Sequence, residues 1–169
     1  MALIKSVRGF SPIFGANIFL AENATIIGDV TMGNDCSIWF NTVVRGDVNS
    51  IKMGNKVNIQ DGAVIHCTFQ KAMTSIGNNV SIGHNALVHG CILEDNVLVG
   101  MGAIIMDNCR IGKNSIIAAG AVVLENTIVE PGSIYAGVPA KKVKSLSDEQ
   151  TNGLEKLANN YVMYAGWFK

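Results

Sequence analysis

The residues best suited to chemistry are the three histidines His66, His84 and His89, which all lie within 24 positions. A neutral imidazole is a common ligand of divalent metal ions, and an ion held by three of them keeps an open position at which it can activate water. A single histidine, by contrast, is more often an ordinary surface or core residue than a ligand. The case for a metal site therefore depends on whether the fold brings these side chains together.

The segments that carry the histidines follow a repeat of six residues. A large apolar residue recurs every six positions, and only three steps differ: nine residues before Met53, eleven before Ile76 and five before Leu93. A period of six fits neither an α-helix nor a simple alternating strand, but it fits a coil of three short strands with about 18 residues per turn. The repeat members, which make six coils, are Ile26, Met32, Ile38, Val44, Met53, Ile59, Ile65, Ile76, Ile82, Val88, Leu93, Val99, Ile105, Ile111, Ile117, Val123, Val129 and Tyr135.

The residues around each repeat member support the same architecture. The residue two positions before each large apolar residue is nearly always small or β-branched, which suits a place near a corner. Glycine often follows the large apolar residue directly, as at Gly33 and Gly83. We expect these glycines to adopt strained corner dihedrals. The pattern resembles that of the left-handed parallel β-helix, so we predict an all-β fold of hexapeptide repeats.

Counting three sides per coil places two histidines in register. Arg45, His66 and His89 each follow an interior residue on the same side of successive coils, so they are stacked on one outward face. Neighbouring strands are about 4.8 Å apart, so one metal ion can bridge His66 and His89. His84 lies on a different side, so it would complete the site only from another subunit packed alongside.

The chain is expected to have two parts. Residues 1–140 form the β-helix, and residues 141–169 form a connector and a C-terminal helix that packs on the prism or on a neighbouring subunit. Ser147 and Gln150 have the spacing of a capping box, and Leu154, Leu157 and Tyr161 follow at helical spacing.

Composition excludes several classes of partner. Lysine plus arginine (13) balances aspartate plus glutamate (13), so there is no basic surplus for nucleic acid or for a membrane surface. No apolar stretch is long enough to span a membrane, and no secretory signal is recognisable. The four cysteines are therefore expected to be reduced thiols of a cytoplasmic protein.

The cysteines themselves point to packing rather than to chemistry. Cys36, Cys91 and Cys109 occupy the small-residue position of the repeat. Cys67 is different because it follows His66 directly. For Cys67 a structural thiol is favoured over a metal ligand or a redox switch.

Several motifs together resemble the γ-class carbonic anhydrase family. They are Arg45-Gly46-Asp47, residues 58–62 (Asn-Ile-Gln-Asp-Gly), His66, and the run of residues 82–90 that contains His84 and His89. The similarity is greatest to the short bacterial branch described as carbonic anhydrase-like or transferase-hexapeptide proteins, and it extends over essentially the whole chain. Hexads alone are unspecific, since acyltransferases share them, whereas this ordered set of motifs is specific.

The resemblance implies a homotrimer that interconverts carbon dioxide and bicarbonate. Zn²⁺, or alternatively Fe²⁺ or Co²⁺, would be held by His66 and His89 of one subunit and His84 of the next, and a water molecule activated by the metal would be the nucleophile. Tyr161, on the expected helix, is a further candidate for the site.

The resemblance also implies roles for the polar residues near the histidines. Gln60 would orient the nucleophile, and Asn58 would lie in the same pocket. Arg45 and Asp61 would pair across the subunit interface, with Asp47 in the same network. Alternatively, these last three residues only stabilise the trimer and have no chemical role.

One departure from the family concerns proton transfer. The founding γ enzyme has acidic residues just after its Arg-x-Asp motif and in the loop after its first histidine. Here Val48 and Asn49 follow that motif, and residues 67–75 contain Lys71 but no acid. Weak hydration activity is therefore expected. Two alternatives remain open: an acyltransferase or CoA thioesterase acting between prisms, and a non-catalytic trimeric binding protein stabilised by its metal.

Overall fold

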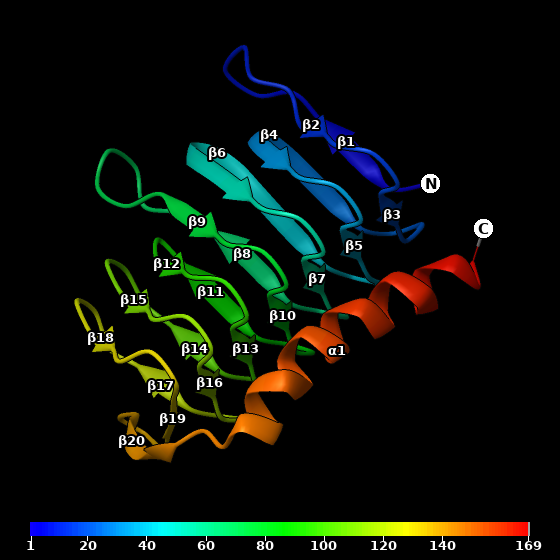
Figure 1. The fold of residues 1–169 in the computed structure, drawn as a ribbon. Helices are drawn as coiled ribbons and strands as arrows, with labels where there is room; N and C mark the ends of the chain where they lie inside the picture. Colours follow the sequence, from blue (N-terminus) through cyan, green and yellow to red (C-terminus); the bar gives the residue numbers. More distant parts are fainter. Residues whose placement is uncertain (169) are drawn as a thin grey trace.

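The computed structural model describes residues 1–168, and Lys169 lies outside the described residues. The predicted left-handed parallel β-helix is confirmed: the chain winds through about seven turns of a β-solenoid and ends in one helix (Figure 1). The strands fall on three faces, because parallel pairing stacks each strand on the equivalent strand of the next turn.

The first and second faces belong to one 12-stranded sheet, since two long strands turn the corner between them. These are β4 (Thr25–Met32) and β6 (Val43–Met53). The first face contains their N-terminal halves with β1 (Leu3–Lys5), β8 (Val64–His66), β11 (Leu87–His89), β14 (Ile104–Ile105) and β17 (Val122–Val123). The second face contains their C-terminal halves with β2 (Ile13–Phe14), β9 (Thr74–Ile76), β12 (Ile92–Leu93), β15 (Arg110–Ile111) and β18 (Ile128–Val129).

The third face is a separate 8-stranded sheet that the helix covers. Its last strand is antiparallel to its neighbour and occupies the segment expected as a connector. The strands are β3 (Phe19–Leu20), β5 (Ser37–Ile38), β7 (Asn58–Ile59), β10 (Ser81–Ile82), β13 (Leu98–Val99), β16 (Ile116–Ile117), β19 (Ser133–Ala136) and β20 (Lys141–Ser145).

The core is the interior of the solenoid. All eighteen large apolar residues of the repeat are buried, as the hexad pattern predicts. Register explains why, because β6, β8 and β11 pair so that Val44, Ile65 and Val88 are stacked directly over one another. Each turn thus covers the apolar side chains of the turn before it.

The prediction of six coils is wrong by about one turn. β1 and β2 pair with β4, and β3 pairs with β5, so residues before Ile26 form an additional N-terminal turn. Phe14 and Leu20 continue the six-residue spacing back from Ile26, and each pairs with a repeat position of the next turn, Phe14 with Met32 and Leu20 with Ile38. The hexad pattern therefore begins before Ile26, and both side chains pack against the core.

The expected role of the repeat glycines is also wrong. Gly33 and Gly83 do not have a positive φ. A Cβ on Gly33 would instead lie 2.6 Å from the carbonyl carbon of Gly54 in the next turn, so close approach between turns requires glycine here. Left-handed corners are taken by other glycines, such as Gly62 and Gly102, and by residues that are mostly asparagine, which tolerates positive φ: Asn17, Asn41, Asn79, Asn85, Asn96, Asn108, Asn114 and Asn126.

The helix α1 (Asp148–Gly166) begins at the expected capping box. The Ser147 side chain accepts from the Gln150 backbone N–H, and the Gln150 side chain accepts from the Ser147 backbone N–H. α1 lies along the third face, next to β5 and β10, and buries Leu154, Ala158 and Ala165 (Figure 1). No helix among residues 1–168 is long and apolar enough to cross a membrane.

Candidate metal centre

The three irregular steps of the repeat meet at one place, the corner between the first and second faces. The nine-residue step is the bulged middle of β6, where the register with β4 shifts opposite Asp47. The eleven-residue step contains the loop closed by the Thr68–Ala72 bridge, and the five-residue step is the short corner at Gly90. Each departure from the regular coil therefore brings polar groups next to β8 and β11.

His66 and His89 form the centre of this cluster. They are direct neighbours in the pairing of β8 with β11, as the sequence register predicts. Nδ1 of His66 lies 3.1 Å from Nε2 of His89, and the two rings are inclined at 63°. Two nitrogen ligands of a tetrahedral zinc site with bonds of about 2.0–2.1 Å lie about 3.4 Å apart, so this spacing fits one shared ion.

A carboxylate contacts the outer nitrogen of each ring. Asp47 Oδ1 lies 3.0 Å from His66 Nε2, and Asp107 Oδ1 lies 2.6 Å from His89 Nδ1. Burial raises the pKa of Asp47, but hydrogen bonds from His66 and Arg45 outweigh it, and the pKa lies below its ordinary value. The pKa of Asp107 is lowered in the same way, because hydrogen bonds from Thr68 and His89 outweigh its burial. Both groups are therefore carboxylates that only accept hydrogen bonds.

These contacts determine what the inner nitrogens present to each other. A neutral imidazole has only one N–H group. In each ring the outer nitrogen must carry that hydrogen, because the carboxylate next to it can only accept a hydrogen bond. Burial, together with the charge of Arg45, lowers the pKa of His66 despite the opposing effect of Asp47, so its neutral form is favoured. When both rings are neutral, the inner nitrogens of His66 and His89 therefore both carry lone pairs. Such a pair at 3.1 Å is stabilised by a cation between the two nitrogens.

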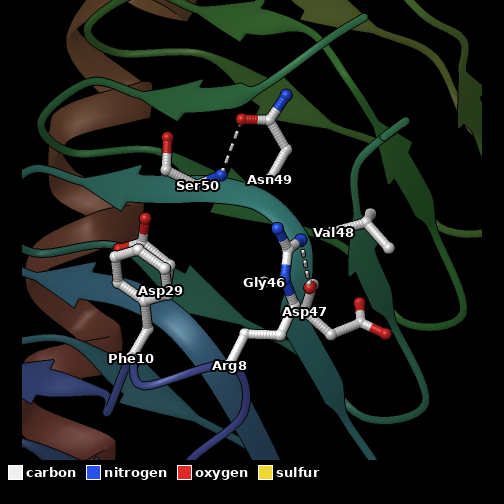
Figure 2. A pocket seen from close by; sticks show the side chains of 8 residues that line it. All are labelled: Arg8, Phe10, Asp29, Gly46, Asp47, Val48, Asn49 and Ser50. Carbon is white, nitrogen blue, oxygen red and sulfur yellow. Dashed lines mark hydrogen bonds between the residues drawn. The ribbon is translucent and has the colours of Figure 1, made fainter. Parts of the chain in front are cut away.

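Two arginines hold Asp47 in place. Arg45 Nη1 donates to the second carboxylate oxygen, Oδ2, at 2.5 Å. Arg8 Nη1 donates to the backbone carbonyl of Asp47 at 3.3 Å, and Figure 2 shows this arginine reaching across a pocket to that carbonyl. The pocket has a volume of about 210 Å³, and Phe10 and Asp29 line it as well.

The remaining histidine belongs to a second cluster on the third face. His84 follows β10, Asp61 follows the neighbouring β7, and His84 Nδ1 lies 2.9 Å from Asp61 Oδ2. Both line a largely apolar cavity of about 290 Å³ together with Trp39 and Tyr161. Burial, and next the charge of Asp61, raise the pKa of Tyr161, so its phenol stays protonated at neutral pH.

Asn58 and Gln60 lie on the same face as His84 and are almost completely buried. Gln60 Nε2 donates to Asn58 Oδ1 at 3.1 Å, and Asn58 Nδ2 donates to Ser81 Oγ at 2.7 Å. The Asn58 amide is thus fixed at both ends, and its carbonyl orients Gln60. Within one chain the predicted site residues form two clusters rather than one.

Comparisons with known proteins identify the family. A model of the bacterial transferase hexapeptide, six repeats long, matches residues 90–125. A probable carbonic anhydrase of Methanocaldococcus jannaschii is 54% identical over 86% of this chain and 91% of its own length. The mitochondrial gamma carbonic anhydrase 2 of Arabidopsis thaliana is 40% identical over 96% of this chain and 60% of its own length. The chain belongs to the γ-class carbonic anhydrase family.

A solved structure has the same fold over nearly the whole chain. It is a hexapeptide transferase family protein from Anaplasma phagocytophilum, with a TM-score of 0.95 and 40% identity. The match covers 99% of this chain and 98% of that one. The γ-class fold therefore also occurs in proteins described as transferases.

The single γ-class chain does not bring three metal ligands together. Among residues 1–168, no group of three histidine, cysteine or acidic side chains is placed to hold a metal ion. His66 and His89 lie on the first face, whereas His84 follows a strand of the third. The expected pairing of Arg45 with Asp61 across an interface stays a prediction, because within the chain Arg45 contacts Asp47 and Asp61 contacts His84.

The cysteines are buried free thiols. Burial raises the pKa of Cys67 above its ordinary value, and it raises that of Cys36 to about 11. The Cys67 thiol contacts the Ser50 carbonyl oxygen and the Thr74 hydroxyl, each at 3.4 Å. This agrees with the packing role expected for these residues.

One residue of the cluster is not apparent from the sequence motifs. Asp107 comes from the corner after β14, a full turn beyond His89, and lines a cavity of about 300 Å³ with His89, Thr68 and Glu125. The repeat could have identified it, because Asp107 follows the interior Ile105 by two residues, just as Gly90 follows Val88.

Proposed function

We propose that this protein is a metal-dependent carbonic anhydrase that interconverts carbon dioxide and bicarbonate. The observation that carries the proposal is the pair of inner nitrogens of His66 and His89, 3.1 Å apart, with a carboxylate at each outer nitrogen. This donor set suits a divalent ion with nitrogen ligands. Zn²⁺ is the first choice, and Fe²⁺ and Co²⁺ are alternatives.

The third ligand in this proposal is His84 of a neighbouring subunit. A chain whose first face carries two ligands and whose third face carries one can complete a site only where two such faces meet. Cyclic three-fold assembly repeats that contact three times, so a homotrimer gives every His66–His89 pair a partner. The proposal thus accounts for the separation of the two clusters within one chain.

The other residues of the second cluster would shape the reaction site. A bound divalent ion supplies Lewis-acid activation of water. Gln60, oriented by Asn58, would hydrogen-bond to the attacking oxygen as donor or acceptor. The protonated Tyr161 would donate a hydrogen bond to the same oxygen. The apolar cavity beside His84 would admit carbon dioxide while limiting the amount of water.

Hydration releases a proton that must reach buffer, and this step is expected to limit the rate. Residues 67–75 contain no acid. Asp107 is already engaged by His89 and Thr68, so it is not free to carry the proton away. We therefore expect low turnover.

Two alternative functions make different predictions about metal. An acyltransferase or CoA thioesterase is favoured by the likeness to a hexapeptide transferase family protein, and it needs one catalytic histidine and no metal. A non-catalytic trimer would bind metal and show no hydration activity. The expected location is the cytoplasm, with which the four free cysteines agree.

The decisive experiment combines metal analysis with a stopped-flow hydration assay on protein prepared with zinc in air and with iron anaerobically. We expect about one metal per chain, lost in His66→Ala and in His89→Ala with little loss of β-helix. Ile92→Ala, at the exposed position of the second face, is the matched control and should keep its metal. If either histidine variant still binds about one metal per chain, the ligand assignment is refuted. If the unmodified protein carries its full metal and shows no hydration activity, the proposed carbonic anhydrase activity is refuted.

A further inference from the structure

Asp107 is placed as a dedicated partner of His89. Its side chain is only 7% exposed, which is unusual for a carboxylate. One oxygen accepts from His89 Nδ1 at 2.6 Å, and the other accepts from Thr68 Oγ1 at 2.5 Å. Lys71 Nζ lies 3.9 Å from that second oxygen. Both oxygens are thus engaged, and the carboxylate cannot rotate without losing a hydrogen bond.

The backbone of the turn below makes room for this carboxylate. A Cβ on Gly90 would overlap Oδ1 of Asp107 and would lie 2.7 Å from Cβ of Ala72. Gly90 also has a φ of +53°, which side chains rarely adopt. Asp107 therefore reaches back to His89 over a position that only glycine can fill.

The hydrogen bond decides which nitrogen of His89 can bind a ligand. A carboxylate accepts only, so Nδ1 must carry a proton, and in the neutral ring the lone pair is then on Nε2. Nε2 is the nitrogen that faces His66. With the other tautomer, an N–H would point at His66 and no metal could enter.

Asp107 and Asp47 are not equivalent in this respect. Asp47 is 23% exposed and shares its charge with the guanidinium of Arg45 at 2.5 Å. Asp107 is more buried, and its closest second partner is the neutral hydroxyl of Thr68. The carboxylate of Asp107 therefore acts on its histidine with less competition.

We propose that Asp107 is the positioning residue that keeps His89 in its Nδ1–H tautomer and thereby sets the metal affinity of the His66–His89 pair. Only the effect on metal affinity rests on the proposed metal site, since the tautomer of His89 is a property of the metal-free protein. Carboxylate partners of this kind typically change metal affinity by about 10–100-fold when removed.

The test uses Asp107→Asn with two readouts. Nitrogen-15 NMR of labelled histidine in the metal-free protein reports the tautomer of His89, and competition with a chelator gives the affinity for Zn²⁺. The amide oxygen of asparagine is a weaker acceptor than a carboxylate, and its NH2 group can face Nδ1 instead, so we expect the variant to populate the other tautomer more than the unmodified protein does and to bind zinc about 10–100-fold more weakly. Glu125→Gln removes an acid that lines the same cavity and leaves the His89 contact intact, so its tautomer and affinity should match those of the unmodified protein.

Thr68→Val covers the case in which Asp107→Asn does not fold. It deletes only the hydroxyl that holds the second oxygen, and it should weaken zinc binding in the same direction by a smaller factor. An unchanged tautomer and an unchanged affinity in Asp107→Asn, or in Thr68→Val where the first variant is unfolded, overturn the proposal. If the unmodified protein binds no zinc, the proposed function fails, whereas the tautomer measurement still decides the role of Asp107.

Discussion

Two variants with complementary defects should restore metal sites when their subunits are mixed. His84→Ala removes the ligand on the third face, and the double variant His66→Ala/His89→Ala removes both ligands on the first face. Because these ligands lie on different faces of one chain, neither homotrimer has a complete site. A subunit of the first kind placed beside one of the second supplies all three histidines at their shared interface.

The expected recovery follows from the geometry of a closed ring. At each interface the subunit that presents its first face must be the His84→Ala chain, and the subunit that presents its third face must be the double variant. With random equal mixing each condition is met half of the time, so about one quarter of all sites are complete. Every mixed trimer then contains one complete site.

The assay measures bound zinc after the two variants are unfolded, mixed and refolded together. Native mass spectrometry must show independently that subunits have exchanged, because metal itself can stabilise the trimer. Refolding each variant alone is the control and should return no metal. Complete exchange without recovery of metal would show that the three histidines do not form a site between subunits.

Two further predictions concern the backbone and proton transfer. Gly33→Ala should lower the free energy of unfolding by about 1–3 kcal/mol, because its Cβ would lie 2.6 Å from the carbonyl carbon of Gly54, whereas Gly153→Ala on α1 meets no neighbour and should raise it by about 0.5–1 kcal/mol. Urea denaturation measures both, and equal effects would contradict the close-approach argument. Gln70→Glu places an acid in the loop that lacks one and should raise the turnover of carbon dioxide hydration, most of all in weak buffer, whereas Asn152→Asp on α1 should not. Fast turnover of the unmodified protein that is insensitive to buffer concentration would refute the missing-shuttle argument.

The fold could be predicted from the sequence because its signal repeats at short range. A residue such as Ile65 is buried for the same reason as Val44 and Val88, and eighteen equivalent positions make the period unmistakable. The additional N-terminal turn was missed although Phe14 and Leu20 keep the six-residue spacing, because Ile4, which pairs with Ile26, lies ten residues before Phe14 and breaks the period.

The candidate metal site could be predicted only in part from the sequence. The register of His66 with His89 follows from counting repeats, and the structure has them as direct neighbours. The place of His84 on another face follows from the same count. The direction of each ring does not, because it depends on hydrogen bonds from residues that the count does not include.

The sequence by itself determined the period, the buried positions and the face on which each histidine lies, because these depend only on spacing along a regular coil. The tertiary structure alone decided which nitrogens face each other. The bulge at Asp47 and the tight corner at Gly90 are departures from the repeat, and they bring two carboxylates to the outer nitrogens of His66 and His89. Asp107 reaches His89 from the corner after β14, one turn away, and such a contact depends on the path of the backbone at the corner rather than on any local pattern.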